Sequence, residues 1–262
     1  GQGPNLLFLQ GLGTSSSSWI SLVDGLKSHF RVLLPDLMGL GFSDRPKRYS
    51  YSLEDSVQQI IYLLKKNRIR SFHLVAHDFG INLSCLLVQK IREEFIDLQP
   101  LSVCFLLDES FFLPKPYQWT PQSPQWVKIP KYTPFKSKGI KLKTLPGKDS
   151  ELGKHIYPFQ LSGDFHRIFN KDMIPKSLVK LDTDKDYLLM FSPLNQDDIP
   201  LSLLIADTVF AKNKESIKKI KALVPHATLR KFSFQSESFY PELNFTDLIS
   251  HYLKVHHKFL NP

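Results

Sequence analysis

One carboxylate in this chain stands where a strand is expected to turn sharply into a helix. The run from 71 to 80 reads SFHLVAHDFG, an apolar segment that ends at Asp78 and leads into a second apolar pattern. Ala76 and Gly80 flank Asp78, and small flanking residues allow the tight turn that lifts one side chain to the tip of a strand. Asp78 is therefore our candidate for a catalytic nucleophile. The alternative is a carboxylate that only complements the positive end of the helix dipole.

Continuous apolar runs alternate with amphipathic segments on both sides of this turn. We expect strands at residues 5–10, 31–35, 71–77, 101–107, 200–206 and 227–234. We expect helices at 15–29, from Ser52 as N-cap onwards, directly after Asp78, at 212–223 and at 244–259. Strands that are apolar throughout and separated by helices predict a mostly parallel sheet, flanked by helices on both faces, in an α/β fold.

The segment 114–198 departs from this pattern. Nine of the 18 prolines lie between positions 114 and 175, and the aromatic residues there follow no regular period. A long irregular insertion in an α/β domain is often a cap over a site, and a loop region without a role at a site is the alternative. We expect 1–113 to be the N-terminal half of the core, 114–198 a cap-like insertion, and 199–262 the C-terminal part of the core.

Length and composition fit one large domain. The chain has 262 residues, of which 42% are hydrophobic, enough for a buried core. Cys85 and Cys104 lie in apolar runs, so we expect core thiols rather than a disulfide framework. The net charge is +9, but the lysines are scattered, and the cluster Lys218, Lys219 and Lys221 falls on an expected solvated helix face. No nucleic-acid-binding motif accompanies them, so we expect no nucleic-acid partner.

The sequence also limits the expected location. No stretch approaches the roughly 18 apolar residues of a membrane span. The chain has no signal-peptide pattern and no initiator Met. We expect a cytoplasmic or endoplasmic-reticulum-associated protein, and membrane association stays open because the N-terminus looks incomplete.

Three motifs, in this order, resemble the α/β-hydrolase superfamily. They are Gln10-Gly11-Leu12-Gly13 after the first strand, the loop DLMGLGFSD from 36 to 44, and the segment around Asp78. The resemblance is clear over 4–113 and weaker over 199–259. It implies an α/β-hydrolase fold whose first two strands are absent from this chain.

The pair His77-Asp78 is similar to the branch that contains epoxide hydrolases and haloalkane dehalogenases. This resemblance implies that Asp78 attacks the carbon of an epoxide or haloalkane and forms an alkyl-enzyme ester. A His, oriented by an acid, would then activate water, and the backbone N–H groups of Leu12 and Phe79 would stabilise the oxyanion. The implied ligand is a small apolar molecule in a pocket under the cap, with no cofactor and no metal.

The His and the acid of this mechanism do not stand at the implied positions. Phe234 occupies the position of the family's His, and Val209 occupies the usual position of its acid. Asp207 is two residues too early, whereas Asp108 follows an earlier strand and is a possible acid, as is its neighbour Glu109. Candidates for an unrecognised base are Glu237, His155 and His166.

Two functional hypotheses remain. The first is an epoxide-hydrolase-like enzyme, for which the insertion offers candidate proton donors, with packing as their alternative role: Tyr117, Tyr132 and Tyr157. Phe79 stands where dehalogenases use a halide-binding Trp, which argues against dehalogenation. The second hypothesis is a pseudo-enzyme that binds a ligand or a protein. Because the first step needs only Asp78, a chain that has lost the His should trap its electrophile as a stable ester.

Overall fold

One parallel sheet organises the molecule. The computed structural model describes residues 1–11, 16–38, 43–44, 46, 48–49, 52–107, 109–112, 187–196 and 198–232. Six strands in these ranges form a sheet in the order β2-β1-β3-β4-β5-β6, and all neighbours are parallel. The strands are β1 (Asn5–Leu9), β2 (Arg31–Leu33), β3 (Ser71–His77), β4 (Gln99–Leu107), β5 (Leu201–Ala206) and β6 (Thr228–Phe232). The expected mostly parallel sheet is therefore confirmed.

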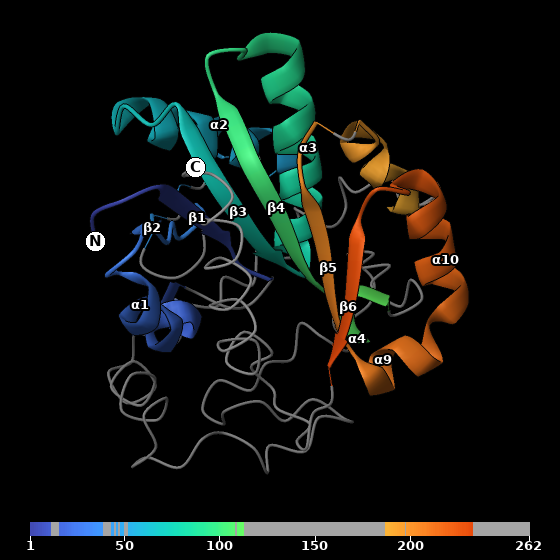
Figure 1. Cartoon of the computed structure of the whole chain (residues 1–262). Helices are drawn as coiled ribbons and strands as arrows, with labels where there is room; N and C mark the ends of the chain where they lie inside the picture. The colour runs from blue at the N-terminus through green and yellow to red at the C-terminus, as the bar shows by residue number, and fades with distance from the viewer. Residues whose placement is uncertain are drawn as a thin grey trace.

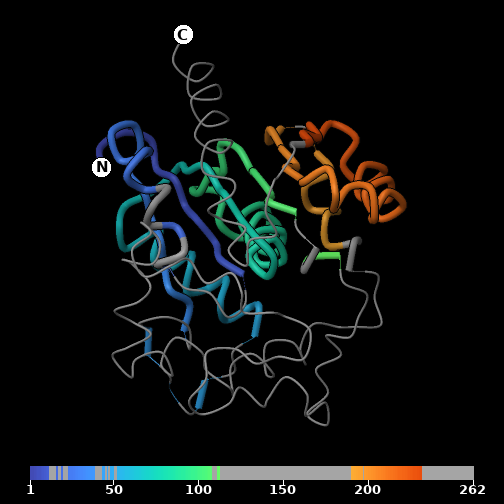
Figure 2. Tube along the Cα trace, turned by 90° about the horizontal axis from the view of Figure 1, so that it is seen from below, coloured from blue at the N-terminus to red at the C-terminus, as the bar shows by residue number. Residues whose placement is uncertain are grey.

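Helices cover the two faces of this sheet (Figure 1). They are α1 (Ile20–Leu26), α2 (Leu53–Lys66), α3 (Phe79–Glu94), α4 (Glu109–Phe112), α9 (Asp207–Lys212) and α10 (Lys214–Leu223), with 3-10 helices η1 (Ser16–Trp19) and η2 (Tyr187–Leu194). Buried side chains of α2, α3, η2 and α10 form the larger hydrophobic cluster on one face. Leu26 of α1 joins Trp19 and Phe30 in a smaller cluster on the other face. Viewed from below in Figure 2, the blue N-terminal strands and the orange C-terminal elements lie at opposite ends of the sheet.

The amphipathic pattern of α2 shows why this segment is a helix and where it starts. The Ser52 side chain accepts a hydrogen bond from the backbone N–H of Asp55 at 3.1 Å, as an N-cap residue does. Val57, Ile60 and Leu64 recur at the spacing of one helical face and are buried. The expected helix start at Ser52 is confirmed.

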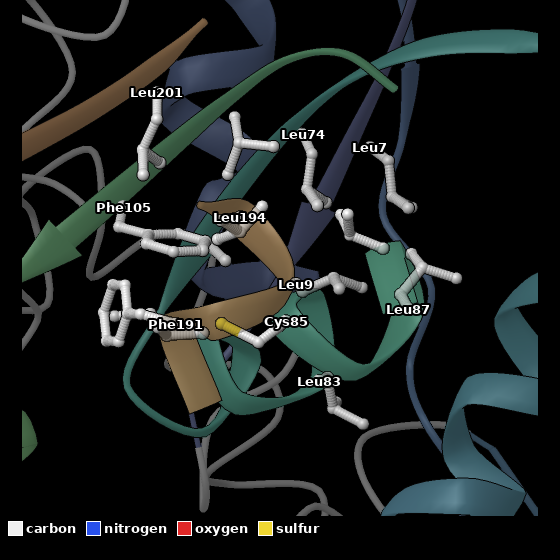
Figure 3. Close-up of a cluster of buried hydrophobic side chains, with 14 of the residues drawn as sticks. Leu7, Leu9, Leu74, Leu83, Cys85, Leu87, Phe105, Phe191, Leu194 and Leu201 are labelled. Carbon is white, nitrogen blue, oxygen red and sulfur yellow. The ribbon is translucent and has the colours of Figure 1, made fainter. Parts of the chain in front are cut away.

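The larger cluster extends to η2, which lies in the part of the chain that the sequence assigns to the insertion. Phe191 and Leu194 are each 1% exposed. Figure 3 shows them among side chains of β1, β4 and α3, including Leu9, Phe105 and Cys85. The ring of Phe191 meets that of Phe105 edge-on at a centroid distance of 5.6 Å. Residues around 190 therefore pack as part of the core, because their aromatic and aliphatic side chains fill the space between α3 and α10.

Several boundaries differ from the sequence-based expectation. The segment expected as one helix at 15–29 is a 3-10 turn followed by α1, which ends at Leu26. Strand β4 begins at Gln99 and includes Pro100, which is tolerated where the register with β3 shifts between Phe72 and His73. The short helix α9 was not expected from the sequence. The expected helix at 244–259 lies outside the described residues.

Candidate active site

The candidate site lies where the strand order reverses. The chain passes from β1 outwards to β2 and then returns to the other side of β1 as β3. In an open parallel sheet, the carboxyl ends of the two strands at such a reversal diverge and leave room for a ligand. Gln10 and Gly11 follow β1 there, and Asp78 follows β3. The topology thus brings together two of the three motifs singled out in the sequence.

Asp78 forms the junction between β3 and α3. Its backbone has φ 49° and ψ −118°, one of two non-glycine residues with positive φ in the described part of the chain. This region of conformational space is costly for a residue with a Cβ atom and is kept where the surrounding structure enforces it. The Asp78 side chain makes no capping hydrogen bond to α3. The backbone geometry is that of a sharp strand-to-helix turn.

Two glycines allow the close approach of β1 to this turn. A Cβ atom on Gly80 would lie 2.2 Å from the backbone oxygen of Leu9, so α3 can pack against β1 only because position 80 has no side chain. A Cβ atom on Gly11 would lie 3.0 Å from Oδ2 of Asp78 and 3.1 Å from Nδ1 of His77. The backbone of Gly11 therefore lies directly against the Asp78 carboxylate.

Asp36 ties the segment after β1 to the segment after β2. Its Oδ1 atom accepts hydrogen bonds from the backbone N–H of Ser16 at 2.7 Å and from Nε2 of Gln10 at 3.3 Å. Its Oδ2 atom accepts one from the Ser16 hydroxyl at 3.2 Å, and its backbone oxygen accepts one from the Ser43 hydroxyl at 2.5 Å. The Asp36 carboxylate thus holds Gln10 and Ser16, which flank the segment 12–15, next to the candidate site. The sequence motif marked Asp36 but not this role, because the partners lie 20 or more positions away.

Phe79 begins α3, so its backbone N–H belongs to the first helical turn, whose amides have no acceptor within the helix. Its side chain is 2% exposed and belongs to the larger hydrophobic cluster. Such an N–H next to Asp78 fits the expected oxyanion donor, although the role itself stays a prediction. Leu12, the other expected donor, lies outside the described residues.

The residues near the end of β5 clarify the expected acid positions. Asp207 starts α9 and is exposed. Val209, at the position of the family's acid, is half-buried and packs against the larger hydrophobic cluster. Glu109, the other possible acid after β4, begins the short helix α4. The remaining sequence-based candidates fall outside the described residues: Asp108, Phe234, Tyr117, Tyr132, Tyr157, Glu237, His155 and His166.

The two cysteines belong to the core. Burial raises the pKa of the Cys85 and Cys104 thiols well above their usual range, so both are core thiols as expected. Within the described ranges, no group of three or more His, Cys, Asp or Glu side chains could hold a metal ion. No helix in the same ranges is long and apolar enough to span a bilayer.

Comparison with known proteins agrees with this fold. Residues 4–133 match the family described as alpha/beta hydrolase fold. A haloalkane dehalogenase variant from Bradyrhizobium elkanii superposes with a TM-score of 0.70 at 18% identity, covering 100% of this chain and 92% of that one. An epoxide hydrolase from Vigna radiata superposes with a TM-score of 0.65 at 18% identity, covering 98% of this chain and 92% of that one. The chain therefore has an α/β-hydrolase fold, in which the six described strands form a parallel sheet flanked by helices.

Curated relatives share a shorter stretch. A Saccharomyces cerevisiae protein named "Uncharacterized hydrolase YNR064C" is 35% identical over 77 residues, 29% of this chain and 27% of that protein. "Probable lysophospholipase BODYGUARD 1" of Arabidopsis thaliana is 34% identical over 92 residues, 33% of this chain and 20% of that protein. The mouse mesoderm-specific transcript protein is 35% identical over 78 residues, 29% of this chain and 23% of that protein.

From the sequence, we expected the stretch 36–116 to resemble the mesoderm-specific transcript protein, and similarity to that protein is confirmed. The chain matches a quarter or less of the length of most of these relatives. They support a hydrolase class for this chain if it is active.

Proposed function

We propose that Asp78 is a nucleophile that forms an alkyl-enzyme ester with a small apolar electrophile. The observation that carries this proposal is the backbone of Asp78, with φ 49° and ψ −118° at the junction of β3 and α3. Strained backbone conformations of this kind cluster at active sites. The epoxide hydrolase and haloalkane dehalogenase among the structural neighbours supply the reaction class.

The chemistry of a carboxylate favours a particular class of substrate. Attack of the Asp78 oxygen on an sp³ carbon forms a C–O bond and opens an epoxide or releases a halide, giving an ordinary ester. Attack on an acyl carbon would instead give a reactive anhydride. An epoxide fits better than a haloalkane, because Phe79 follows Asp78 where dehalogenases use a halide-binding Trp. The ligand would sit under the segment 114–198, with its tyrosines as candidate donors to the opening oxygen.

Release of the product would be slow. In hydrolysis of the ester, the N–H groups of Leu12 and Phe79 would stabilise the oxyanion, but Phe234 replaces the water-activating His. Val209, which stands at the position of the family's acid, has no ionisable group and packs against the larger hydrophobic cluster. The proposal is therefore a hydrolase fold that completes alkylation and stalls at the ester.

A pseudo-hydrolase that only binds a ligand or protein is the second candidate. It is favoured by the packing of Val209, since a side chain that packs against the core serves the fold rather than a catalytic dyad.

Intact-mass spectrometry after incubation with small epoxides and haloalkanes tests the proposal. We expect one adduct per chain with an epoxide, absent in Asp78→Ala and retained in Asp97→Ala, which removes an exposed carboxylate paired with Lys65. Product formation that Asp78→Ala abolishes would reveal a base elsewhere in the chain. A folded protein that gives neither adduct nor product would favour the pseudo-hydrolase.

A further inference from the structure

We propose that the exposed face of α10 binds the surface of an anionic phospholipid bilayer. This inference goes beyond the proposed function and does not depend on it. Between Asp207 and Phe232, the sequence has seven Lys and Arg residues and two Asp and Glu residues, an excess of five positive charges in a chain of net charge +9. Within the described part of the chain, this positive excess lies at one end of the sheet, around α9, α10 and β6 (Figure 1).

Three lysines, which we call the α10 lysine face, are placed for contact with a partner. Lys214, Lys218 and Lys219 are exposed. Ile217 and Ile220, on the other side of the same helix, are buried in the larger hydrophobic cluster. At 3.6 residues per turn, the lysines fall on the side of the helix opposite the two isoleucines. The helix is thus anchored by its apolar side and presents its cations outwards.

The α10 lysine face differs from three other lysines on the described surface, which pair with acids. Elsewhere, Lys27 pairs with Asp24 at 2.7 Å, Lys65 with Asp97 at 3.5 Å and Lys90 with Glu94 at 2.5 Å. Among the described residues, no ion pair involves Lys214, Lys218 or Lys219. Glu215, the one acidic residue of α10, lies on the same side of the helix and offsets part of this charge, which leaves a net charge of +2 there.

The charge of Lys214 does not stabilise α10, whereas Glu215 lies three and four positions before Lys218 and Lys219, a spacing that favours a helix. Lys214 and Lys218 are four positions apart, and like charges at this spacing destabilise a helix. Lys214 is also the first residue of α10, where the helix dipole disfavours a cation. By contrast, Lys221 donates a hydrogen bond to the backbone oxygen of Pro225 at 2.8 Å and another to that of Ala227, so it stabilises the end of the helix. A binding role explains why an unfavourable lysine stands at the start of α10, while a structural one stabilises its end.

The chemistry of this face favours lipid headgroups over nucleic acid. All three cations are lysines, which act as point charges, whereas Arg provides the planar fork that phosphate and base recognition use. The α10 sequence KESIKKIKAL contains no aromatic residue on which a base could stack. An anionic bilayer needs only charge, and each lysine near its surface strengthens binding about fivefold.

Vesicle sedimentation tests this proposal. The wild-type chain should bind vesicles of phosphatidylcholine with roughly a third phosphatidylserine, but not vesicles of phosphatidylcholine alone. Binding should fall between about 0.1 M and 1 M salt, because the Debye length shortens from about 10 Å to 3 Å. The variant with Lys214→Gln, Lys218→Gln and Lys219→Gln should bind on the order of a hundredfold more weakly.

The matched control removes the same charge elsewhere, with Lys27→Gln, Lys65→Gln and Lys90→Gln. Its affinity for vesicles should stay within about threefold of wild type, because these lysines lie outside the α10 lysine face. It should also fold, since exposed ion pairs contribute little to stability. Circular dichroism would verify that both variants fold. Equal losses in the two triple variants would show that net charge alone acts, which overturns the proposal. Absence of phosphatidylserine-dependent binding by the wild type would overturn it as well. Binding to duplex DNA without vesicle binding would assign the face to nucleic acid instead.

Discussion

The backbone of Asp78 has a positive φ angle, a conformation that residues with a Cβ atom adopt at a cost in free energy. Glycine adopts it freely. We therefore expect Asp78→Gly to be more stable than Asp78→Ala by about 1–2 kcal/mol, although both lose the carboxylate. Denaturant unfolding of the two variants measures this difference. Equal stability would mean that the turn is not strained, and the main support for a functional role of Asp78 would disappear.

Gly80 allows α3 to approach β1, because a Cβ atom there would lie 2.2 Å from the backbone oxygen of Leu9. Neither backbone can move without disturbing the sheet, so Gly80→Ala should lower the free energy of unfolding by about 2–4 kcal/mol. The control is Gly25→Ala in the exposed part of α1, which should be neutral or stabilising by up to about 1 kcal/mol. A Gly80→Ala protein as stable as wild type would contradict the close approach.

At the scale of whole elements, Asp36 links the segments that follow β1 and β2. It accepts hydrogen bonds from Gln10 and from the backbone and side chain of Ser16. Hydrogen bonds to a charged group contribute about 1.5–3 kcal/mol, so Asp36→Ala should destabilise the fold by at least about 2 kcal/mol. Asp24→Ala, which removes only the exposed pair with Lys27, should cost less than about 1 kcal/mol. Thermal unfolding of both variants tests whether the link is structural.

The elements also show how far the sequence alone could lead. Hydrophobic periodicity predicted β3, α2 and α3 well, because each buries one continuous set of apolar side chains. Flanking small residues likewise located the turn at Asp78. The short helix α9 has no buried residues and so left no periodic signal. The bonds of Asp36 are tertiary contacts between distant loops, which no local pattern encodes.

Over the whole molecule, the two cysteines report on the integrity of the core. Cys85 and Cys104 are each at most 1% exposed, and desolvation by burial raises the pKa of both thiols well above the usual value. A thiol reagent should therefore modify the native chain only as fast as it unfolds, and denatured chain at once. Rapid modification of native protein would contradict the packed sheet.

The same thiols give stability a defined pH dependence. The unfolded thiols ionise above a pKa near 9, whereas the buried ones stay protonated, so the unfolded state binds fewer protons there. Their stabilising contribution is complete below about pH 8 and is lost as the pH rises further. Urea unfolding at about pH 8 and pH 10 should show a decrease that is smaller in the Cys85→Ala, Cys104→Ala variant.

The central claim is that this hydrolase fold uses Asp78 as its nucleophile and retains the ester. Tandem mass spectrometry of peptides from epoxide-treated native protein tests it most directly. The account predicts that the added mass lies on Asp78 and persists after dilution into neutral, epoxide-free buffer. Added mass on other residues, or on Asp78 only in denatured protein, would contradict it.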